Sequence, residues 1–141
     1  MAATGHAKWT GDIAGGEGTI DTGTGVVAGS YSAASRFGDG KGTNPEELLG
    51  AAHAACFSMA LTLILGEAGH EPGTVETEAR VFLRRTETGF EIHKIELETE
   101  GTVPGITEED FQKHAELAKA VCPVSKALAG PEITLEAKLA G

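Results

Sequence analysis

Basic residues are scarce in this sequence. Its 141 residues include 11 Lys and Arg against 21 Asp and Glu, which gives a formal net charge of −10. No basic stripe appears along the chain, although proteins that bind nucleic acids or anionic membranes normally carry one. The composition therefore argues against both partners, and the negative charge favours a soluble protein.

Cysteine is also scarce, with Cys56 and Cys122 as the only two. A chain of this length buries roughly 70% of its unfolded surface and needs no disulfide or metal to hold its core. The two thiols are therefore free for another role. Free cysteines are most often inert buried side chains, and that interpretation stays open on composition alone.

Several functional signatures are missing. The chain has no Walker A loop, dinucleotide-binding fingerprint or G-x-S-x-G elbow. Residues 1–30 contain no apolar run long enough for a secretory signal, so we expect a cytoplasmic protein. The apolar segment Leu48–Leu65 contains His, Ser and Thr and has acidic residues on both sides. A buried helix explains this segment better than a membrane span does.

The hydrophobic patterns predict an α+β fold in a single domain over residues 1–141, with antiparallel sheet packed on a buried helix. Short strands are expected at 6–13 and 18–22, a polar loop at 31–42, a hairpin of strands at 75–83 and 90–99 with a bulge near His93 and Lys94, a helix from Thr107 to Val121, and a final strand at 133–139. No repeat or linker divides the sequence.

The clearest element is the apolar helix that begins at Asn44. This residue is a good cap, Pro45 suits the first helical position, and Glu47 is placed to complete a capping box. The helix is expected to end near Ala68. Glu47 then has a structural role at the helix start, and Glu46 is left for another partner.

The surroundings of the two cysteines differ. Cys122 precedes Pro123 at a helix break, where the amide dipoles of the turn at 123–128 favour a thiolate. Cys56 lies within the apolar helix, where burial raises a thiol pKa unless a cation is near. Of the few cations before that helix, only Arg36 has the planar fork that also binds a carboxylate at two points.

Helix geometry separates two of these candidates. Glu46 and Cys56 are ten residues apart on the expected helix, which corresponds to about 15 Å at about 1.5 Å per residue. They cannot meet within one chain. If both serve one site, helices from two subunits must bring them together, so the spacing predicts an oligomer.

His53 allows two other interpretations, because it lies three residues before Cys56 on the same helix face. A metal site would use both with Cys122 and another His, but no second close-spaced ligand pair is visible. A cysteine hydrolase would use His53 as its base, but no third group orients that base.

Two motifs resemble those of a known family. Residues 42–61 read GTNPEELLGAAHAACFSMAL, and residues 122–125 read CPVS. Together they resemble the OsmC/Ohr family of thiol peroxidases, and the match extends over essentially the whole chain. The sequence HAACFSM at 53–59 and the absence of any arginine before Arg36 resemble the OsmC (osmotically inducible protein C) branch more than the Ohr branch.

The resemblance implies an intertwined homodimer, in which antiparallel sheets wrap around two long buried central helices and two active sites lie at the subunit interface. It makes Cys56 the peroxidatic cysteine and Cys122 the resolving one. Arg36 and Glu46 become the polar pair that orients and activates the thiolate, although Glu47 occupies the same motif. No cofactor or metal is implied.

The resemblance also implies the reaction. Organic hydroperoxides, and hydrogen peroxide less well, are reduced to alcohols through a cysteine sulfenic acid and an intramolecular disulfide. An external dithiol, such as a lipoyl-bearing protein, then reduces the disulfide. Candidates for an apolar wall that favours organic substrates are Phe37, Phe57, Met59 and Leu61. The alternative is a non-enzymatic redox sensor that uses the same two cysteines.

Overall fold

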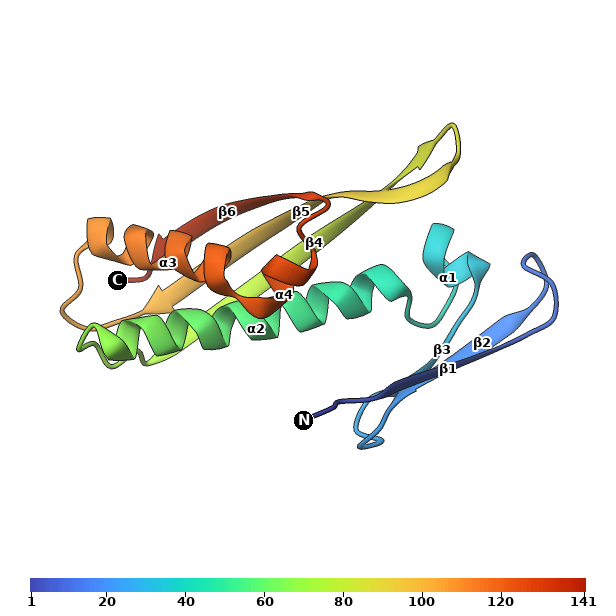
Figure 1. Cartoon of the computed structure of the whole chain (residues 1–141), viewed down its shortest axis with the longest axis horizontal. Helices are drawn as coiled ribbons and strands as arrows, with labels where there is room; N and C mark the ends of the chain where they lie inside the picture. The colour runs from blue at the N-terminus through green and yellow to red at the C-terminus, as the bar shows by residue number, and fades with distance from the viewer. The chain divides into compact units, whose positions relative to one another are not determined.

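The computed structural model describes all 141 residues, which form two compact units, 1–48 and 49–141 (Figure 1). In chain order the elements are β1 (Gly5–Thr10), β2 (Glu17–Thr22), β3 (Ala28–Tyr31), α1 (Ala33–Phe37), α2 (Pro45–Glu67), β4 (Thr74–Thr86), β5 (Gly89–Thr102), α3 (Glu108–Val121), α4 (Pro123–Ala127) and β6 (Glu132–Leu139). The α+β class is confirmed. The single domain over 1–141 stays a prediction.

The first unit contains the antiparallel sheet β1-β2-β3, followed by α1. The helix begins at Ser32, whose hydroxyl accepts from the Ser35 amide while the Ser35 hydroxyl accepts from the Ser32 amide. These two contacts form a capping box. The prediction of a loop throughout 31–42 is therefore wrong over Ala33–Phe37, because the paired serines outweigh the polar, glycine-rich composition.

The second unit contains the sheet β4-β5-β6, with α2 and α3 packed on one face. Its buried core combines apolar side chains of both helices with those of the sheet: Phe57, Leu61, Leu65, Ile95, Leu97, Val103, Phe111, Ala115, Ala118 and Cys122. At Gly50 a Cβ atom would lie 3.0 Å from the Ala79 carbonyl oxygen. The missing side chain thus lets α2 lie close against β4.

The strand pairing of this sheet is mixed. β4 and β5 form the predicted antiparallel hairpin, and the register shifts so that Phe82 pairs with Lys94 and Leu83 with Ile92. His93 is the extra residue, which confirms the predicted bulge. β6 pairs with β5 in parallel, so the prediction of antiparallel pairing is wrong for this strand. The physical reason is the connection through α3 and α4, since parallel neighbours require such a crossover.

The cap of α2 follows the prediction, but the predicted capping box does not form, because the Glu47 carboxylate bonds to Thr43 and not to the Asn44 amide. The Glu47 amide donates to Asn44 Oδ1 at 2.7 Å, so Asn44 is the cap. The Glu47 carboxylate accepts from the Thr43 hydroxyl at 2.7 Å, which also holds it at the helix start.

The two faces of α2 differ. One face is fully buried at Phe57, Leu61 and Leu65, as expected for a core helix. On the other face Met59 is 75% exposed and Leu63 is 63% exposed. The prediction of a buried helix therefore holds for one face within the single chain. By length and composition alone α2 would also pass as a membrane span, but core helices pass the same test.

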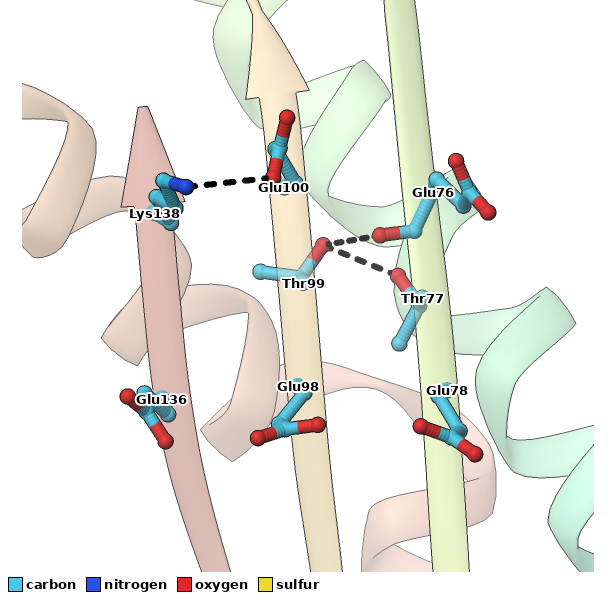
Figure 2. A pocket seen from close by; sticks show the side chains of 8 residues that line it. All are labelled: Glu76, Thr77, Glu78, Glu98, Thr99, Glu100, Glu136 and Lys138. Atoms are coloured by element: carbon cyan, nitrogen blue, oxygen red, sulfur yellow. Dashed lines mark hydrogen bonds and ion pairs between the residues drawn. The ribbon is translucent and has the colours of Figure 1, made fainter. Parts of the chain in front are cut away.

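The second sheet's other face is strongly acidic. Glu78, Glu98 and Glu136 lie side by side on its three strands, as Figure 2 shows. They border a hollow of about 400 Å³ that is also lined by Glu76, Glu100 and Lys138. Arg80 pairs with several of these carboxylates, but glutamates remain in the majority. This hollow therefore disfavours anionic ligands.

Candidate active site

The two cysteines meet in the second unit. Cys56 lies in the middle of α2, Cys122 lies between α3 and α4, and their Sγ atoms are 3.0 Å apart. Both are free thiols. Cys122 is fully buried, whereas Cys56 is partly exposed, so Cys56 is the more accessible residue of the two. Because Cys122 directly follows α3, this contact places the end of α3 against the middle of α2.

Pro123 explains the position of Cys122. The residue before a proline is pushed out of the helical region, and Cys122 has the extended ψ of 122° that this predicts. Pro123 then occupies the first position of α4, where its missing amide hydrogen is not needed. The chain therefore turns at Cys122 and directs the first amides of α4 toward the sulfurs.

The pKa values of the two thiols are shifted in opposite directions. Burial and the hydrogen bond with Cys122 raise the pKa of Cys56, with partial opposition from the Val124 amide. Burial alone would also raise the pKa of Cys122, but hydrogen bonds from Cys56, Ser125 and Val124 outweigh it and lower that pKa. The geometry of the two sulfurs allows Cys122 to donate a hydrogen bond to Cys56. The hydrogen-bond donors around Cys122 favour its thiolate, however, and in that state Cys56 keeps its hydrogen and donates it to Cys122.

A buried histidine lies next to this pair. His53 is 0% exposed, and its Nε2 atom is 2.7 Å from the Ser125 hydroxyl, while its Nδ1 atom has no hydrogen-bond partner. Burial lowers the pKa of His53 and keeps the ring neutral. Neither ring nitrogen bonds to Cys56, so the ring is not placed as the base of a cysteine hydrolase. No group of three or more His, Cys, Asp or Glu side chains is arranged to hold a metal ion.

A separate polar cluster lies in residues 1–48, where Arg36 of α1 forms an ion pair with Glu46 of α2. Arg36 Nη2 is 2.6 Å from Glu46 Oε1, and Arg36 Nε lies 3.1 and 3.2 Å from the two carboxylate oxygens. Glu46 is only 8% exposed. Glu46 therefore pairs with the arginine while Glu47 stays at the helix start, and the role of Glu46 in catalysis stays a prediction.

Short polar contacts hold this ion pair in place. The Ser35 hydroxyl donates to the Thr43 carbonyl at 2.7 Å, and the Asn44 side-chain amide donates to the Ser35 carbonyl at 3.2 Å. These bonds fasten α1 to the start of α2. They therefore hold the backbone segments that carry Arg36 and Glu46 against each other.

The sequence analysis named Cys56, Cys122, Arg36 and Glu46, which the structure brings together as two separate pairs. It did not name Ser125, which also interacts with Cys122. The CPVS motif contained this serine, three residues after Cys122 and therefore in the first turn of α4. Of the expected apolar wall, Phe57 and Leu61 are wrong because both lie fully inside the core. Phe37 and Met59 are 51% and 75% exposed.

Two thiols in contact, one of them on a partly exposed residue, are an arrangement that can carry redox chemistry through cysteine. The acidic hollow offers no such nucleophile, so the sulfur pair is the candidate site. The OsmC-like protein family matches residues 38–137. The chain belongs to that family and is a cysteine-based peroxidase, which favours the enzyme over the redox sensor.

Individual relatives agree with this assignment. Peroxiredoxin OsmC of Escherichia coli (strain K12) is 52% identical over 136 residues, which cover 96% of this chain and 94% of that protein. An organic hydroperoxide resistance protein-like 2 of Staphylococcus epidermidis is 36% identical over 93 residues, 64% of this chain and 63% of that protein. The crystal structure of the organic hydroperoxide resistance protein OhrB of Bacillus subtilis has a TM-score of 0.72 at 30% identity, covering 97% of this chain and 98% of that one.

Proposed function

We propose that this protein reduces organic hydroperoxides to alcohols, and hydrogen peroxide less well, with Cys56 as the peroxidatic cysteine and Cys122 as the resolving one. The observation that supports this best is the pair of sulfurs 3.0 Å apart, in which Cys56 is partly exposed and Cys122 is buried. A peroxide must approach from solvent, so Cys56 is the sulfur it meets first.

The first step is attack of the Cys56 thiolate on the peroxide oxygen that does not bear the organic group. The O–O bond breaks, the alkoxide takes a proton to become the alcohol, and Cys56 is oxidised to sulfenic acid. Cys122 then attacks that sulfur and one water is lost as the disulfide forms. A 3.0 Å separation requires only a small approach of the sulfurs, since a disulfide bond is about 2.05 Å long.

The last step is reduction of the disulfide by an external dithiol, which restores both thiols and is itself oxidised. We infer a dithiol of the lipoyl class, free or protein-bound. Because Cys122 is buried, the reductant meets Cys56 first. We also place the protein in the cytoplasm, where thiols are kept reduced between turnovers.

Within one chain, no positively charged group lowers the pKa of Cys56, as a peroxidatic cysteine requires. Its pKa is raised by burial and by Cys122, while a peroxidatic cysteine must react as the thiolate. Arg36, held by Glu46, has the charge that would reverse this shift. Glu46 and Cys56 are ten residues apart along α2, or about 15 Å, so we propose that the pair of one subunit serves Cys56 of the other.

A homodimer would also cover the unpartnered face of α2. Met59 and Leu63 are large apolar side chains exposed on this helix, and exposed apolar patches are typical of interaction surfaces. Small residues on the same face, including Ala51 and Ala55, would allow a second helix to approach closely. We therefore propose that α2 packs against α2 of a second copy.

The names of two relatives, which refer to organic hydroperoxide resistance, support the choice of substrate. The test is a steady-state assay with cumene hydroperoxide and hydrogen peroxide, each with dihydrolipoamide as reductant. We expect a higher kcat/KM for cumene hydroperoxide. Equal or greater efficiency with hydrogen peroxide would refute the proposed preference.

A further inference from the structure

The reaction described above does not use His53, although the chain buries it completely. Burying a polar ring costs free energy unless the ring is hydrogen-bonded. The structure gives His53 one partner, because its Nε2 atom lies 2.7 Å from the Ser125 hydroxyl oxygen. Ser125 is itself buried, so this bond is shielded from water. It joins α2 to α4.

The bond between His53 and Ser125 repeats the spacing of the contact between the two cysteines. His53 precedes Cys56 by three residues on α2, and residues three apart share one face of a helix. On the facing segment, Cys122 precedes Ser125 by three residues. His53 contacts Ser125 at 2.7 Å, and the two cysteine sulfurs are 3.0 Å apart. Two side-chain contacts therefore link α2 to residues 122–125, and they lie one helical turn apart along α2.

The segment from Cys122 to Ser125 is stiff enough to transmit the effect of this bond. The Lys126 amide donates to the Cys122 carbonyl at 3.0 Å, which closes the first turn of α4. Pro123 restricts the backbone within that turn. When the side chain of Ser125 is held in place, the movement of Cys122 is limited as well.

The two contacts differ in what happens to them during the reaction. The Cys56 thiol is consumed when it becomes a sulfenic acid, so the contact between two thiols cannot hold Cys122 until the second step. The added oxygen also needs room beside a sulfur that is only 3.0 Å away. Neither His53 nor Ser125 reacts, so their bond persists through the thiol, sulfenic acid and disulfide states.

We propose that His53 and Ser125 are positioning residues, which hold Cys122 within reach of Cys56 after the first step and make resolution faster than over-oxidation. This inference rests on the roles proposed for the two cysteines. Both side chains act through the position of Cys122 and not on the peroxide.

Two reactions compete for the Cys56 sulfenic acid. In resolution, the Cys122 sulfur attacks the Cys56 sulfur, the S–S bond forms, the S–O bond breaks, and the hydroxyl leaves as water with the proton that Cys122 gives up. In over-oxidation, the Cys56 sulfur attacks a second hydroperoxide, takes one oxygen to become a sulfinic acid, and releases the alcohol. Resolution depends on how well the two sulfurs are positioned. A loosely held Cys122 therefore favours the sulfinic acid, which thiols do not reduce.

Rapid mixing with one equivalent of cumene hydroperoxide separates the two steps. Ser125→Ala should form the Cys56 sulfenic acid at the parent rate and the disulfide roughly tenfold more slowly, because the buried imidazole loses its only partner. Ser125→Thr, which keeps the hydroxyl, should restore the rate. With excess hydroperoxide, mass spectrometry should detect more sulfinic acid in Ser125→Ala than in the parent. Disulfide formation at the parent rate in folded Ser125→Ala would overturn the inference.

Substitutions of His53 test the same bond from its other end. His53→Gln retains an amide donor near the position of Nε2 and should form the disulfide faster than His53→Leu, which should resemble Ser125→Ala. Ser58→Ala is the matched control, since this α2 hydroxyl donates to Thr77 of β4 at 2.7 Å and should resolve at the parent rate. An equal loss in Ser58→Ala would indicate general loosening of α2 and would overturn the inference. Should His53→Leu not fold, the Ser125 variants decide the matter.

An equilibrium measurement tests the bond without any peroxide. Each protein is equilibrated with mixtures of reduced and oxidised glutathione, and the Cys56–Cys122 disulfide is quantified after the free thiols are alkylated. Well-positioned groups have a high effective concentration toward each other. Ser125→Ala should lower that effective concentration roughly tenfold, which raises the reduction potential by about 30 mV. An unchanged potential in the folded variant would overturn the inference.

Failure of the proposed function would be seen in a different experiment. Absence of sulfenic acid on Cys56 in Cys122→Ser, after addition of hydroperoxide, would overturn the proposed roles of the two cysteines. The glutathione equilibrium would still decide whether the bond between His53 and Ser125 positions Cys122.

Discussion

The chain carries two pairs of reactive or charged side chains, Arg36 with Glu46 and Cys56 with Cys122, and the two pairs differ in their charge. In residues 1–48 the charges of Arg36 and Glu46 neutralise each other through three short contacts. In residues 49–141 Cys56 and Cys122 are in contact, but Cys56, the more accessible residue, has the raised pKa. The first cluster has charge without a nucleophile, and the second has a nucleophile without a cation.

This difference suggests why a peroxidase of this kind would need two subunits. A thiol buried on an apolar helix is stable but unreactive, and a cation placed beside it permanently would have to be buried with it. If Arg36 comes from the other subunit, where it is already paired with Glu46, no isolated charge has to be buried. The reactive combination would then form only on assembly.

The largest expected effect comes from removing one member of the sulfur cluster. Cys56→Ser should abolish peroxide consumption, because no nucleophile remains at the more accessible position. Cys122→Ser should retain a single turnover and accumulate a sulfenic acid that dimedone traps. Peroxide consumption per subunit and mass spectrometry check both. Multiple turnovers by Cys56→Ser would exclude it as the peroxidatic residue.

The next largest effect is expected from a substitution that prevents the proposed dimer from forming, so that Arg36 and Glu46 of one subunit cannot reach Cys56 of the other. Met59→Glu places a charge on the exposed apolar face of α2, where burial against a second copy would cost several kcal/mol. We expect a monomer in sedimentation and a loss of activity of at least roughly 100-fold. Leu117→Glu, at a 49% exposed position on α3, is the matched control and should leave both unchanged. A dimeric, active Met59→Glu would contradict the proposed interface.

A smaller loss is expected when the polar cluster is altered in place. Arg36→Lys keeps the charge but loses the fork that contacts both Glu46 oxygens. Removing one preorganised donor from an active site typically lowers the rate by roughly 100-fold. Arg84→Lys is the control, since Arg84 forms a similar but exposed ion pair with Glu91. Equal kcat/KM values for the two variants would show that Arg36 has no special role.

The sequence predicted much of this arrangement because its local signals were strong. Asn44 and Pro45 marked the start of α2, Pro123 marked the break at Cys122, and the capping argument left Glu46 free for Arg36. Each of these depends on a few neighbouring residues. The bulge at His93 was visible for the same reason, since one residue shifts the alternation of the strand.

Other features depended on residues distant in the sequence. The bond between His53 and Ser125 joins positions 72 apart, and no periodicity indicates it. The parallel pairing of β6 depends on the path of the crossover rather than on the strand's own residues. The helix α1 was missed because its serine capping box is a weak signal among glycines. Tertiary packing settled what local propensity could not.

The smallest effect concerns stability and His53. Burial lowers its pKa from the ordinary value of 6.5, so below that pH the unfolded chain binds a proton that the folded chain does not. Stability should therefore be complete above the unfolded pKa and decline as pH falls, until the folded ring titrates, by at most about 1.4 kcal/mol per pH unit. Urea unfolding should show a shallower acid-side decline in His53→Gln than in Ser58→Ala. Identical slopes would contradict a buried neutral His53.

In the proposed dimer, Arg36 and Glu46 of one subunit serve Cys56 of the other. The most direct measurement mixes Cys56→Ser subunits with Glu46→Gln subunits, isolates the heterodimer with two affinity tags, and follows peroxide turnover. One of its two sites would combine an intact Cys56 with an intact polar pair, so we expect about half of the wild-type activity. Activity no higher than the mean of the two parent homodimers would contradict a shared site.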